Sequence, residues 1–279
     1  MIRISDKKIG AFRERVWAHY RREGREMPWR DGKSGKRVTP YHILVSEVML
    51  QQTQVPRVVV KFAEFTKLFP TVAALAMASA ADVIRAWQGL GYNRRALNLH
   101  KAAQIIVRDH KGKVPRTRAV LEALPGIGPA TAGAILAYAF NEPEVFIETN
   151  IRAVFIHEFW KSDHGAIHDK ELLPLVARAL DMENPREWYW ALMDYGVMLK
   201  EKHKNPSRRS AHHITQKPFA TSDRYVRGNI LKILARDGVA TTEVMAHTMD
   251  RGEARVARLA ATLETEGFIK KRGDMWRLV

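Results

Sequence analysis

The chain has 279 residues, of which 46% are hydrophobic and 27% charged, with a formal net charge of +16 and a pI near 10.1. This composition excludes a disordered chain, and the length is sufficient for two domains. The positive charge indicates a polyanionic partner, nucleic acid before an anionic membrane. The sequence contains no cysteine, which excludes disulfides, thiolate metal sites and a cysteine nucleophile. It shows neither a signal peptide nor an apolar run near the roughly 20 residues of a spanning helix, so we expect a cytoplasmic protein.

Apolar residues recur at helical spacing along most of the chain, beginning with Ile9, Phe12 and Val16. A polar loop with two glycines follows over 30–40 and ends in Thr-Pro. Further helices are predicted over 41–53, 56–68, 81–88, 94–110, 117–123, 129–140, 149–160, 169–181 and 186–200. The pattern therefore predicts a mainly α fold.

The segment 200–227 differs in character, because KEKHKNPSRRSAHHITQKP is basic, polar and nearly free of apolar periodicity. It predicts a linker or a basic strap. Beyond it, helices are predicted over 225–236, 241–249 and 253–266, and GFIKKRGDMWRLV alternates like a β-hairpin that turns at Arg-Gly-Asp. Three helices closed by a hairpin predict a winged-helix-like domain, a shape that binds DNA in some proteins and other proteins elsewhere.

The stretch LPGIGPATAGAI, residues 124–135, joins two predicted helices through a Gly-Ile-Gly turn. Pro129 suits the first helical position, where no N–H is needed. Glycines let the backbone approach another surface, and the first N–H groups of the second helix point outward with the positive end of its dipole. The turn predicts a phosphate site, with a plain helix–helix connection as the alternative. The residues expected at this site are Gly126, Ile127, Gly128, Ala130 and Thr131.

This hairpin resembles that of the helix-hairpin-helix DNA glycosylases. Four further stretches, SEVMLQQTQV, GLGYNRRALNLHKAA, MPWR and LMDYGVML, are similar in order and spacing to the MutY-type adenine DNA glycosylases. The resemblance covers roughly residues 8–200, and the combination is more specific than any single motif. It implies a two-lobed helix-hairpin-helix core over 1–200, with 41–142 as one lobe and 1–40 plus 143–200 as the other, then a basic linker over 201–222 and the winged-helix-like domain over 223–279.

Two acids carry the chemistry that the resemblance implies. Hydrolysis of an N-glycosidic bond needs a protonated leaving base and a stabilised oxocarbenium-like sugar, so two carboxyl groups in different environments are required. Glu47 lies in the apolar run HILVSEVML, where burial raises a carboxyl pKa and suits a general acid. The resemblance makes Glu47 the family's catalytic acid, and a helix-surface glutamate is the alternative.

The second acid departs from the family pattern. In VFIETNIRAV, Glu148 stands where the family has aspartate, and Asn150 matches the family's asparagine. The resemblance places both among the catalytic residues, with the Glu148 carboxylate near the sugar cation and one methylene further out than that of an aspartate. We expect Thr149 or Asn150 to cap the following helix. The alternative for Glu148 is a first-turn acid favoured by the helix dipole.

Ala130 occupies the position at which the endonuclease III branch has a Schiff-base lysine. An alanine cannot attack the sugar, so we expect water as the nucleophile and no strong AP lyase activity. Weak strand cleavage by another amine stays open.

The target base must leave the stack before it is cut. Gln51 and Gln52 resemble the family's wedge and intercalating residues, and Tyr92 resembles the tyrosine inserted beside the opposing base. For Tyr92 the alternative is core packing. The residues that match the family's base pocket are Arg25, Trp29 and Leu50, although Trp29 is equally compatible with an ordinary core tryptophan.

Basic residues at the start of the 94–110 helix predict a phosphate-binding face, with a solvated charged face as the alternative. These residues are Arg94, Arg95, His100 and Lys101.

Family members usually carry four cysteines after the LMDYGVML helix, which ligate a [4Fe–4S] cluster. The residues at that spacing offer no thiolate, so we expect no cluster: Lys200, Ser207, Ser210 and Gln216. Histidines of the strap lack nearby acids at ligand spacing, and we expect them to face phosphate rather than a metal: His203, His212 and His213. An alkali ion at the hairpin carbonyls stays open.

The resemblance implies a monofunctional DNA glycosylase of base excision repair. Its substrate would be a lesion or mismatch in double-stranded DNA, with adenine favoured and an abasic site as product. The tail is too short and too helical for the family's 8-oxoguanine-reading domain, so reading of 8-oxoguanine is not implied. We expect a monomer at the nucleoid. Two alternatives are kept, a related glycosylase for thymine, uracil or a modified pyrimidine, and a damage-sensing DNA-binding protein without chemistry.

Overall fold

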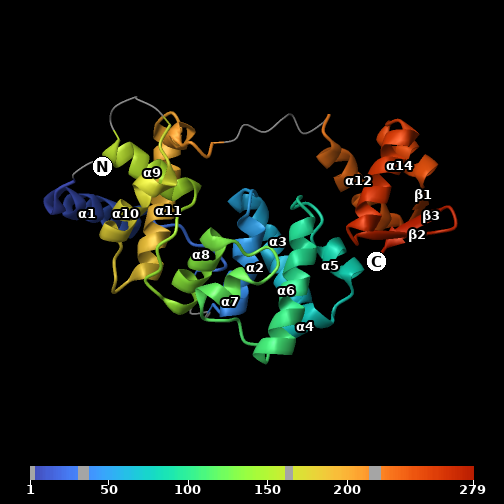
Figure 1. Cartoon of the computed structure of the whole chain (residues 1–279), viewed down its shortest axis with the longest axis horizontal. Coiled ribbons are helices and arrows are strands. Elements are labelled where there is room, and N and C mark those ends of the chain that lie inside the picture. Colours follow the sequence, from blue (N-terminus) through green and yellow to red (C-terminus); the bar gives the residue numbers. More distant parts are fainter. Residues whose placement is uncertain (1–3, 31–37, 161–165, 214–220) are drawn as a thin grey trace. The chain divides into compact units, whose positions relative to one another are not determined.

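Helices make up most of the protein in the computed structural model, which describes residues 4–30, 38–160, 166–213 and 221–279 (Figure 1). This confirms the predicted mainly α class. The helices are α1 (Asp6–Glu23), α2 (Pro40–Leu50), α3 (Val55–Leu68), α4 (Val72–Met77), α5 (Ala80–Ala86), α6 (Arg94–His110), α7 (Arg118–Glu122), α8 (Pro129–Phe140), α9 (Thr149–Phe159), α10 (Asp169–Ala179), α11 (Pro185–Lys202), the 3₁₀ helix η1 (Pro206–Arg209), α12 (Asp223–Asp237), α13 (Thr242–Met249) and α14 (Glu253–Thr265). The strands are β1 (Val239–Thr241), β2 (Ile269–Arg272) and β3 (Met275–Leu278).

The chain forms two compact units, and their boundaries cross the sequence more than once. The first comprises 1–44, 116–123 and 127–215, and the second comprises 45–115, 124–126 and 216–279. The lobe boundaries given above stay a prediction, as does the separate linker.

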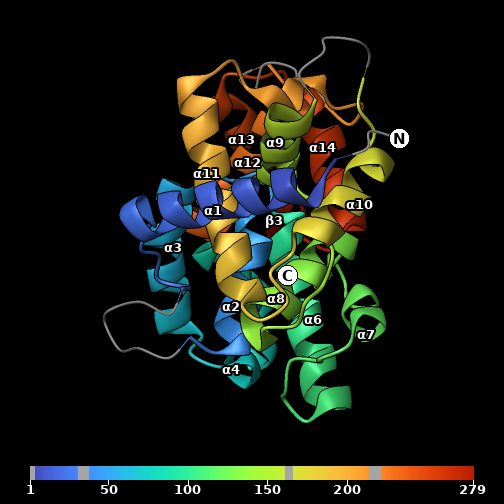
Figure 2. The same cartoon turned by 90° about the vertical axis from the view of Figure 1, so that its left-hand side faces the viewer.

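The core of the first unit is aromatic. Phe12 of α1 meets Phe155 and Phe159 of α9 and Trp188 of α11 at ring-centre distances of 5.4, 5.2 and 6.0 Å. All four are buried, and edge-to-face packing of such rings adds stability beyond their buried area. Figure 2 shows α1 beside α9 and α11, which supply the other rings of this core, and beside α10, which it also contacts.

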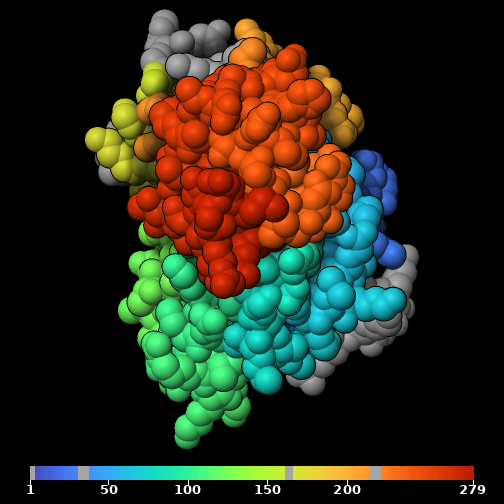
Figure 3. Space-filling model, turned by 90° about the vertical axis from the view of Figure 1, so that its right-hand side faces the viewer, coloured from blue at the N-terminus to red at the C-terminus, as the bar shows by residue number. Residues whose placement is uncertain are grey.

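The second unit joins α3–α6 to the C-terminal domain, residues 223–279 (α12 to β3), through shared apolar packing. Ile84 and Leu97 belong to the same buried cluster as Val226, Ile230 and Leu234 of α12. Within this domain the three strands form an antiparallel sheet in the order β1-β3-β2. Three helices and this sheet make the predicted winged-helix-like arrangement, drawn in orange to red in Figure 3 with the hairpin darkest.

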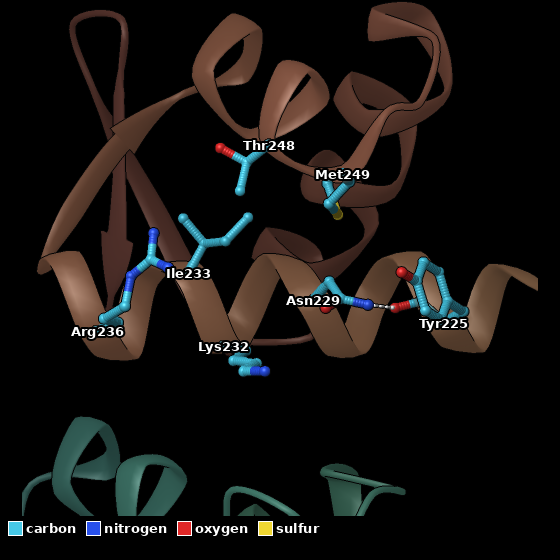
Figure 4. Close-up of a pocket in the computed structure, with 7 residues that line it drawn as sticks. All are labelled: Tyr225, Asn229, Lys232, Ile233, Arg236, Thr248 and Met249. Atoms are coloured by element: carbon cyan, nitrogen blue, oxygen red, sulfur yellow. Dashed lines mark hydrogen bonds between the residues drawn. The ribbon is translucent and has the colours of Figure 1, made fainter. Parts of the chain in front are cut away.

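The C-terminal domain also contains a pocket of about 210 Å³ between α12 and α13 (Figure 4). Lys232 and Arg236 line it beside Ile233, and the Asn229 side chain donates to the Tyr225 carbonyl at 2.9 Å. None of the predicted catalytic residues lines this pocket.

Within the described ranges, no helix combines the length and apolar character needed to cross a lipid bilayer.

Candidate active site

The hairpin between α7 and α8 is anchored in the core and exposed at its tip. Leu124 and Ile127 are buried, whereas Gly126 and Gly128 are exposed. Gly126 has φ +80°, and a Cβ there would lie 2.9 Å from the Asn98 side chain, so the turn requires glycine. Gly128 caps α8 without a side chain, and α8 begins at the next residue. The Gly128 cap leaves the first N–H groups of α8 without a side-chain partner from the cap residue, and the phosphate site expected there stays a prediction.

The helix α2, which carries Glu47, ends in the wedge segment. Glu47 is half-buried on α2 between buried Ser46 and Val48. Gln51 follows the helix, and its side-chain amide donates to the Gly126 carbonyl at 3.2 Å. This bond links the predicted wedge directly to the hairpin.

Arg95 organises the end of α2 from inside the protein. It is 8% exposed, and its Nη1 donates to the carbonyls of Val48, Met49 and Gln51 at 2.9, 2.7 and 2.6 Å. These are the carbonyls that a helix C-terminus leaves without intrahelical partners, and a cation there also complements the dipole. Burial lowers the pKa of Arg95 to about 10, which keeps it a cation at neutral pH.

The same guanidinium holds the loop that presents Tyr92. Its Nη2 donates to the carbonyls of Leu90 and Gly91 at 3.2 and 3.0 Å and to the Thr53 hydroxyl at 2.9 Å. One buried side chain therefore fixes both the end of α2 and the Tyr92 loop, the two segments that carry the predicted wedge and intercalating residues.

Gln52 and Tyr92 share an unusual backbone conformation. Their φ angles are +56° and +45°, in the left-handed region that side-chain-bearing residues rarely adopt. Both residues are exposed, Tyr92 by 38%. Strained residues of this kind persist where the surroundings over-determine them, often at functional sites. The exposure of Tyr92 argues against the alternative that it is a core residue.

The predicted basic face of α6 is smaller than the sequence indicated. Arg94 and Lys101 are exposed, but Arg95 and His100 are buried. The Arg95 N–H groups are occupied by carbonyls, and burial lowers the pKa of His100 and so disfavours its cation. The structure thus corrects the phosphate-binding prediction for Arg95 and His100, because neither side chain presents a cation to solvent.

Glu148 caps helix α9 with its own carboxylate. Its Oε1 accepts from the backbone N–H groups of Asn150 and Ile151 at 2.5 and 2.9 Å, and its Oε2 accepts from the Asn150 side chain at 3.3 Å. The expectation that Thr149 or Asn150 would cap this helix is therefore wrong, since Glu148 is the N-cap residue.

The Glu148 carboxyl titrates in a poorly hydrated environment. Burial raises its pKa, although the two backbone N–H groups, Lys200 and Arg152 act in the opposite direction. Burial likewise lowers the pKa of Lys200, which Glu148 partly restores. The Glu148 corner, formed by Glu148 and Lys200, therefore holds a carboxyl group and an amine whose charged forms are both disfavoured by burial. A carboxylate with little hydration interacts strongly with a nearby cation.

Asn150 packs closely behind this carboxylate. Its side-chain nitrogen also lies 3.5 Å from the Met193 sulfur, and its buried Oδ1 has no hydrogen-bond partner. Gly196 lets α11 approach Asn150 closely, because a Cβ at position 196 would lie 2.8 Å from the Asn150 Cβ and 2.9 Å from the Asn150 carbonyl oxygen.

Comparison with known proteins assigns the chain to a family. The family model described as HhH-GPD superfamily base excision DNA repair protein matches residues 45–252. The chain is 33% identical over 273 residues to the adenine DNA glycosylase of Mycobacterium tuberculosis, covering 89% of this chain and 88% of that protein. It is 32% identical over 279 residues to that of Mycolicibacterium smegmatis, covering 90% and 89%. The chain belongs to the HhH-GPD superfamily. It is a DNA glycosylase.

Solved structures share the fold of this glycosylase. A thermostable thymine-DNA glycosylase matches with a TM-score of 0.61 and 22% identity, covering 74% of this chain and 94% of that chain. A non-covalent endonuclease III–DNA complex matches with a TM-score of 0.56 and 17% identity, covering 79% and 92%.

The MPWR motif of the glycosylase is fixed by an aspartate that the sequence analysis did not single out. Asp194 of α11, 3% exposed, accepts from the backbone N–H and Nε of Arg25 at 2.8 and 2.7 Å and from both Nη groups of Arg30 at 2.9 and 3.0 Å. Burial acts to raise the pKa of Asp194, but Arg30 and Arg25 outweigh it and hold that pKa below its usual range. Trp29, between them in sequence, is 5% exposed. The signal for Asp194 was an acid inside the apolar run LMDYGVML.

The strap of the glycosylase lacks cluster ligands and is held by hydrogen bonds instead. Ser207 and Ser210 are buried, and the Asn205 side chain accepts from the Ser207 N–H and hydroxyl at 3.0 and 2.8 Å. Arg209 donates to the Trp160 carbonyl at 2.6 Å. A [4Fe–4S] cluster does not fit here, because the chain has no thiolate to bind it.

The other strap positions differ in what surrounds them. Lys200 lies half-buried near Glu148, and Gln216 falls outside the described residues. The three strap histidines are exposed: His203, His212 and His213.

Proposed function

We propose that this glycosylase hydrolyses the N-glycosidic bond of adenine flipped out of mismatched or damaged duplex DNA and leaves an abasic site. Its similarity to adenine DNA glycosylases along most of the chain supports adenine over other bases. The observation that carries the proposal is the position of Glu47 on α2, one turn before the wedge glutamine Gln51 that bonds to the hairpin.

In the proposed reaction, Glu47 donates a proton to the flipped base as the bond to the sugar breaks. The Glu148 carboxylate, oriented by Asn150 and the start of α9, stabilises the oxocarbenium-like sugar. Water then attacks the sugar carbon and releases its proton to solvent. Arg25, Trp29 and Leu50 are proposed to contact the base, and the turn 126–131 the phosphates.

The proposal includes water rather than an amine as the nucleophile. The residue after Pro129 is Ala130, which cannot form a Schiff base. Borohydride treatment during turnover should trap no covalent protein–DNA complex. The enzyme would act as a monomer at the cytoplasmic nucleoid, without an iron–sulfur cluster. An alkali ion at the hairpin carbonyls stays a prediction.

The test is Glu47→Gln on a panel of duplexes carrying adenine, thymine or uracil opposite normal and oxidised guanine. Loss of a general acid should lower alkali-labile product by about 10²-fold or more. The matched control is Glu64→Gln, an exposed glutamate of α3 bonded to Lys61, which should leave the rate unchanged. Undiminished base release by Glu47→Gln would eliminate the assignment. Release of thymine or uracil alone would favour the pyrimidine enzyme, and tight binding with no abasic product would favour a damage sensor.

A further inference from the structure

The hydroxyl of Tyr92 is bound by the C-terminal domain. Arg224, in the first turn of α12, donates from Nη1 to the Tyr92 hydroxyl at 3.0 Å. The Arg95 guanidinium lies 5.6 Å from the centre of the same ring. The exposed tyrosine is therefore held at both ends, at its backbone by the Arg95 network and at its hydroxyl by Arg224.

The helix that carries Arg224 is itself fixed to α6. Glu266 accepts from Arg94 at 2.6 Å and from Arg227 at 2.5 Å, so one carboxylate joins α6 to α12. Arg94 also lies over the Phe268 ring at 5.8 Å. Beneath these polar contacts, Leu97 shares the apolar cluster of the domain. Arg224 thus reaches Tyr92 from a helix that is packed against the rest of its unit.

We propose that the C-terminal domain braces Tyr92, with Arg224 as its positioning residue. This inference rests on the proposed function and on the role that the family resemblance implies for Tyr92, insertion into the duplex beside the opposing base. A ring whose hydroxyl is already bound has fewer conformations to lose on insertion, so the free energy of inserting it is more favourable. The brace acts on the opening of the duplex, whereas the bond-breaking step belongs to the two acids.

The variants that test the brace are Arg224→Met, Arg224→Lys, Tyr92→Phe and the double variant Arg224→Met with Tyr92→Phe. Tyr92→Phe keeps the ring and removes the acceptor oxygen. The matched control is Arg258→Met, an exposed arginine of the same domain whose partner is Asp223. Melting temperatures of all variants check that the domain stays folded.

Two readouts are used, the single-turnover excision rate at subsaturating enzyme and the dissociation constant for a duplex whose target is 2′-fluoro-2′-deoxyadenosine, which resists cleavage. Arg224→Met and Tyr92→Phe should each lower the excision rate and raise the dissociation constant by about threefold to tenfold, the range expected for the loss of one hydrogen bond. The double variant should be no worse than either single one, Arg224→Lys should recover part of the activity, and Arg258→Met should match the wild type.

Additive effects in the double variant would overturn the brace, because the two residues would then act independently. Faster excision or tighter binding by Arg224→Met would overturn it too, since Arg224 would then restrain Tyr92 rather than prepare it. If the wild type excised no base from any duplex, the proposed function would fail. The coupling between Arg224 and Tyr92 would still be measured from the dissociation constants alone.

Discussion

Arg95 and Glu148 each hold the end of one helix, and they do so in opposite ways. Arg95 is a cation at the carbonyl end of α2, and Glu148 is an anion at the amide end of α9. Each sits at the helix end whose partial charge it complements. The two residues nevertheless differ in how completely the surrounding protein satisfies them.

All three guanidinium nitrogens of Arg95 donate hydrogen bonds to backbone carbonyls, and one also reaches a hydroxyl. Glu148 receives its two backbone bonds on one oxygen, while its second oxygen takes a longer bond from Asn150. Burial still raises the pKa of Glu148. The comparison indicates that Arg95 serves structure, whereas the charge of Glu148 is less fully compensated, which supports its proposed role beside the sugar cation.

The largest effect is expected for Glu148→Gln, which keeps the acceptor for the α9 amides and removes the charge. Excision should fall by about 10²–10³-fold, the usual cost of removing an electrostatic stabiliser. Glu148→Asp, which keeps the charge, should retain more activity than the glutamine variant. Single-turnover kinetics measure both, and equal rates for glutamine and wild type would remove Glu148 from the mechanism.

Glu148→Gln should also be more stable than the wild type at neutral pH. Because the folded-state pKa of Glu148 is raised, its protonated form favours folding, and that contribution disappears as pH rises through the raised pKa. Glutamine cannot ionise, so its melting temperature should exceed that of the wild type at pH 7 and approach it below the ordinary carboxyl range. A lower melting temperature at pH 7 would show that the charge stabilises the fold.

Arg95→Met tests the structural role of Arg95, and it should lower the free energy of unfolding. It leaves the carbonyls at the end of α2 and in the Tyr92 loop without donors, at a cost of about 3–5 kcal/mol in the free energy of unfolding. Arg94→Met, next in sequence but exposed and paired with Glu266, should cost about 1 kcal/mol or less. Urea unfolding distinguishes the two, and similar costs would contradict the organising role of Arg95.

Much of the fold was predictable because it rests on periodicity. The helices α6 and α8 have the predicted bounds. The six-residue helix α4, capped by the Thr71 side chain, and the three-residue strand β1 are too short to show a period, and both were missed.

The site was harder to predict, because side chains there go against their usual preferences. Arg95 lies at helical spacing from Leu99 and Ile106 on the buried face of α6, yet a basic residue is normally taken as exposed. Glu148 caps a helix although glutamate is not among the preferred capping residues. In both cases a tertiary contact overrides the local rule.

Gly196→Ala tests how tightly the Glu148 corner is packed. The new methyl group would meet Asn150, so α9 or α11 must shift, at about 1–3 kcal/mol. Gly10→Ala is the control, because nothing lies within 4 Å of its Cβ position in helix α1 and alanine favours helix there. Melting temperatures and excision rates should both fall for Gly196→Ala only. An unchanged rate would show that the position of Asn150 does not matter for catalysis.

The smallest effect is expected on the salt dependence of DNA affinity, from basic residues of the β2–β3 hairpin. Lys270 and Arg277 face each other across the β2–β3 hairpin, two residues from Arg272 on the same face. Like charges directly opposite one another destabilise a strand pair, so this arrangement favours a polyanionic partner.

Replacing Lys270, Arg272 and Arg277 by glutamine should lower the slope of log affinity against log salt by about 0.9 for each phosphate that the variant no longer neutralises. The excision rate at saturating enzyme should stay unchanged. The control exchanges Lys and Arg at the three positions and keeps the charge, so its slope should match the wild type. If the glutamine variant kept the wild-type slope, the hairpin would be a solvated surface and DNA binding would belong to the glycosylase core alone.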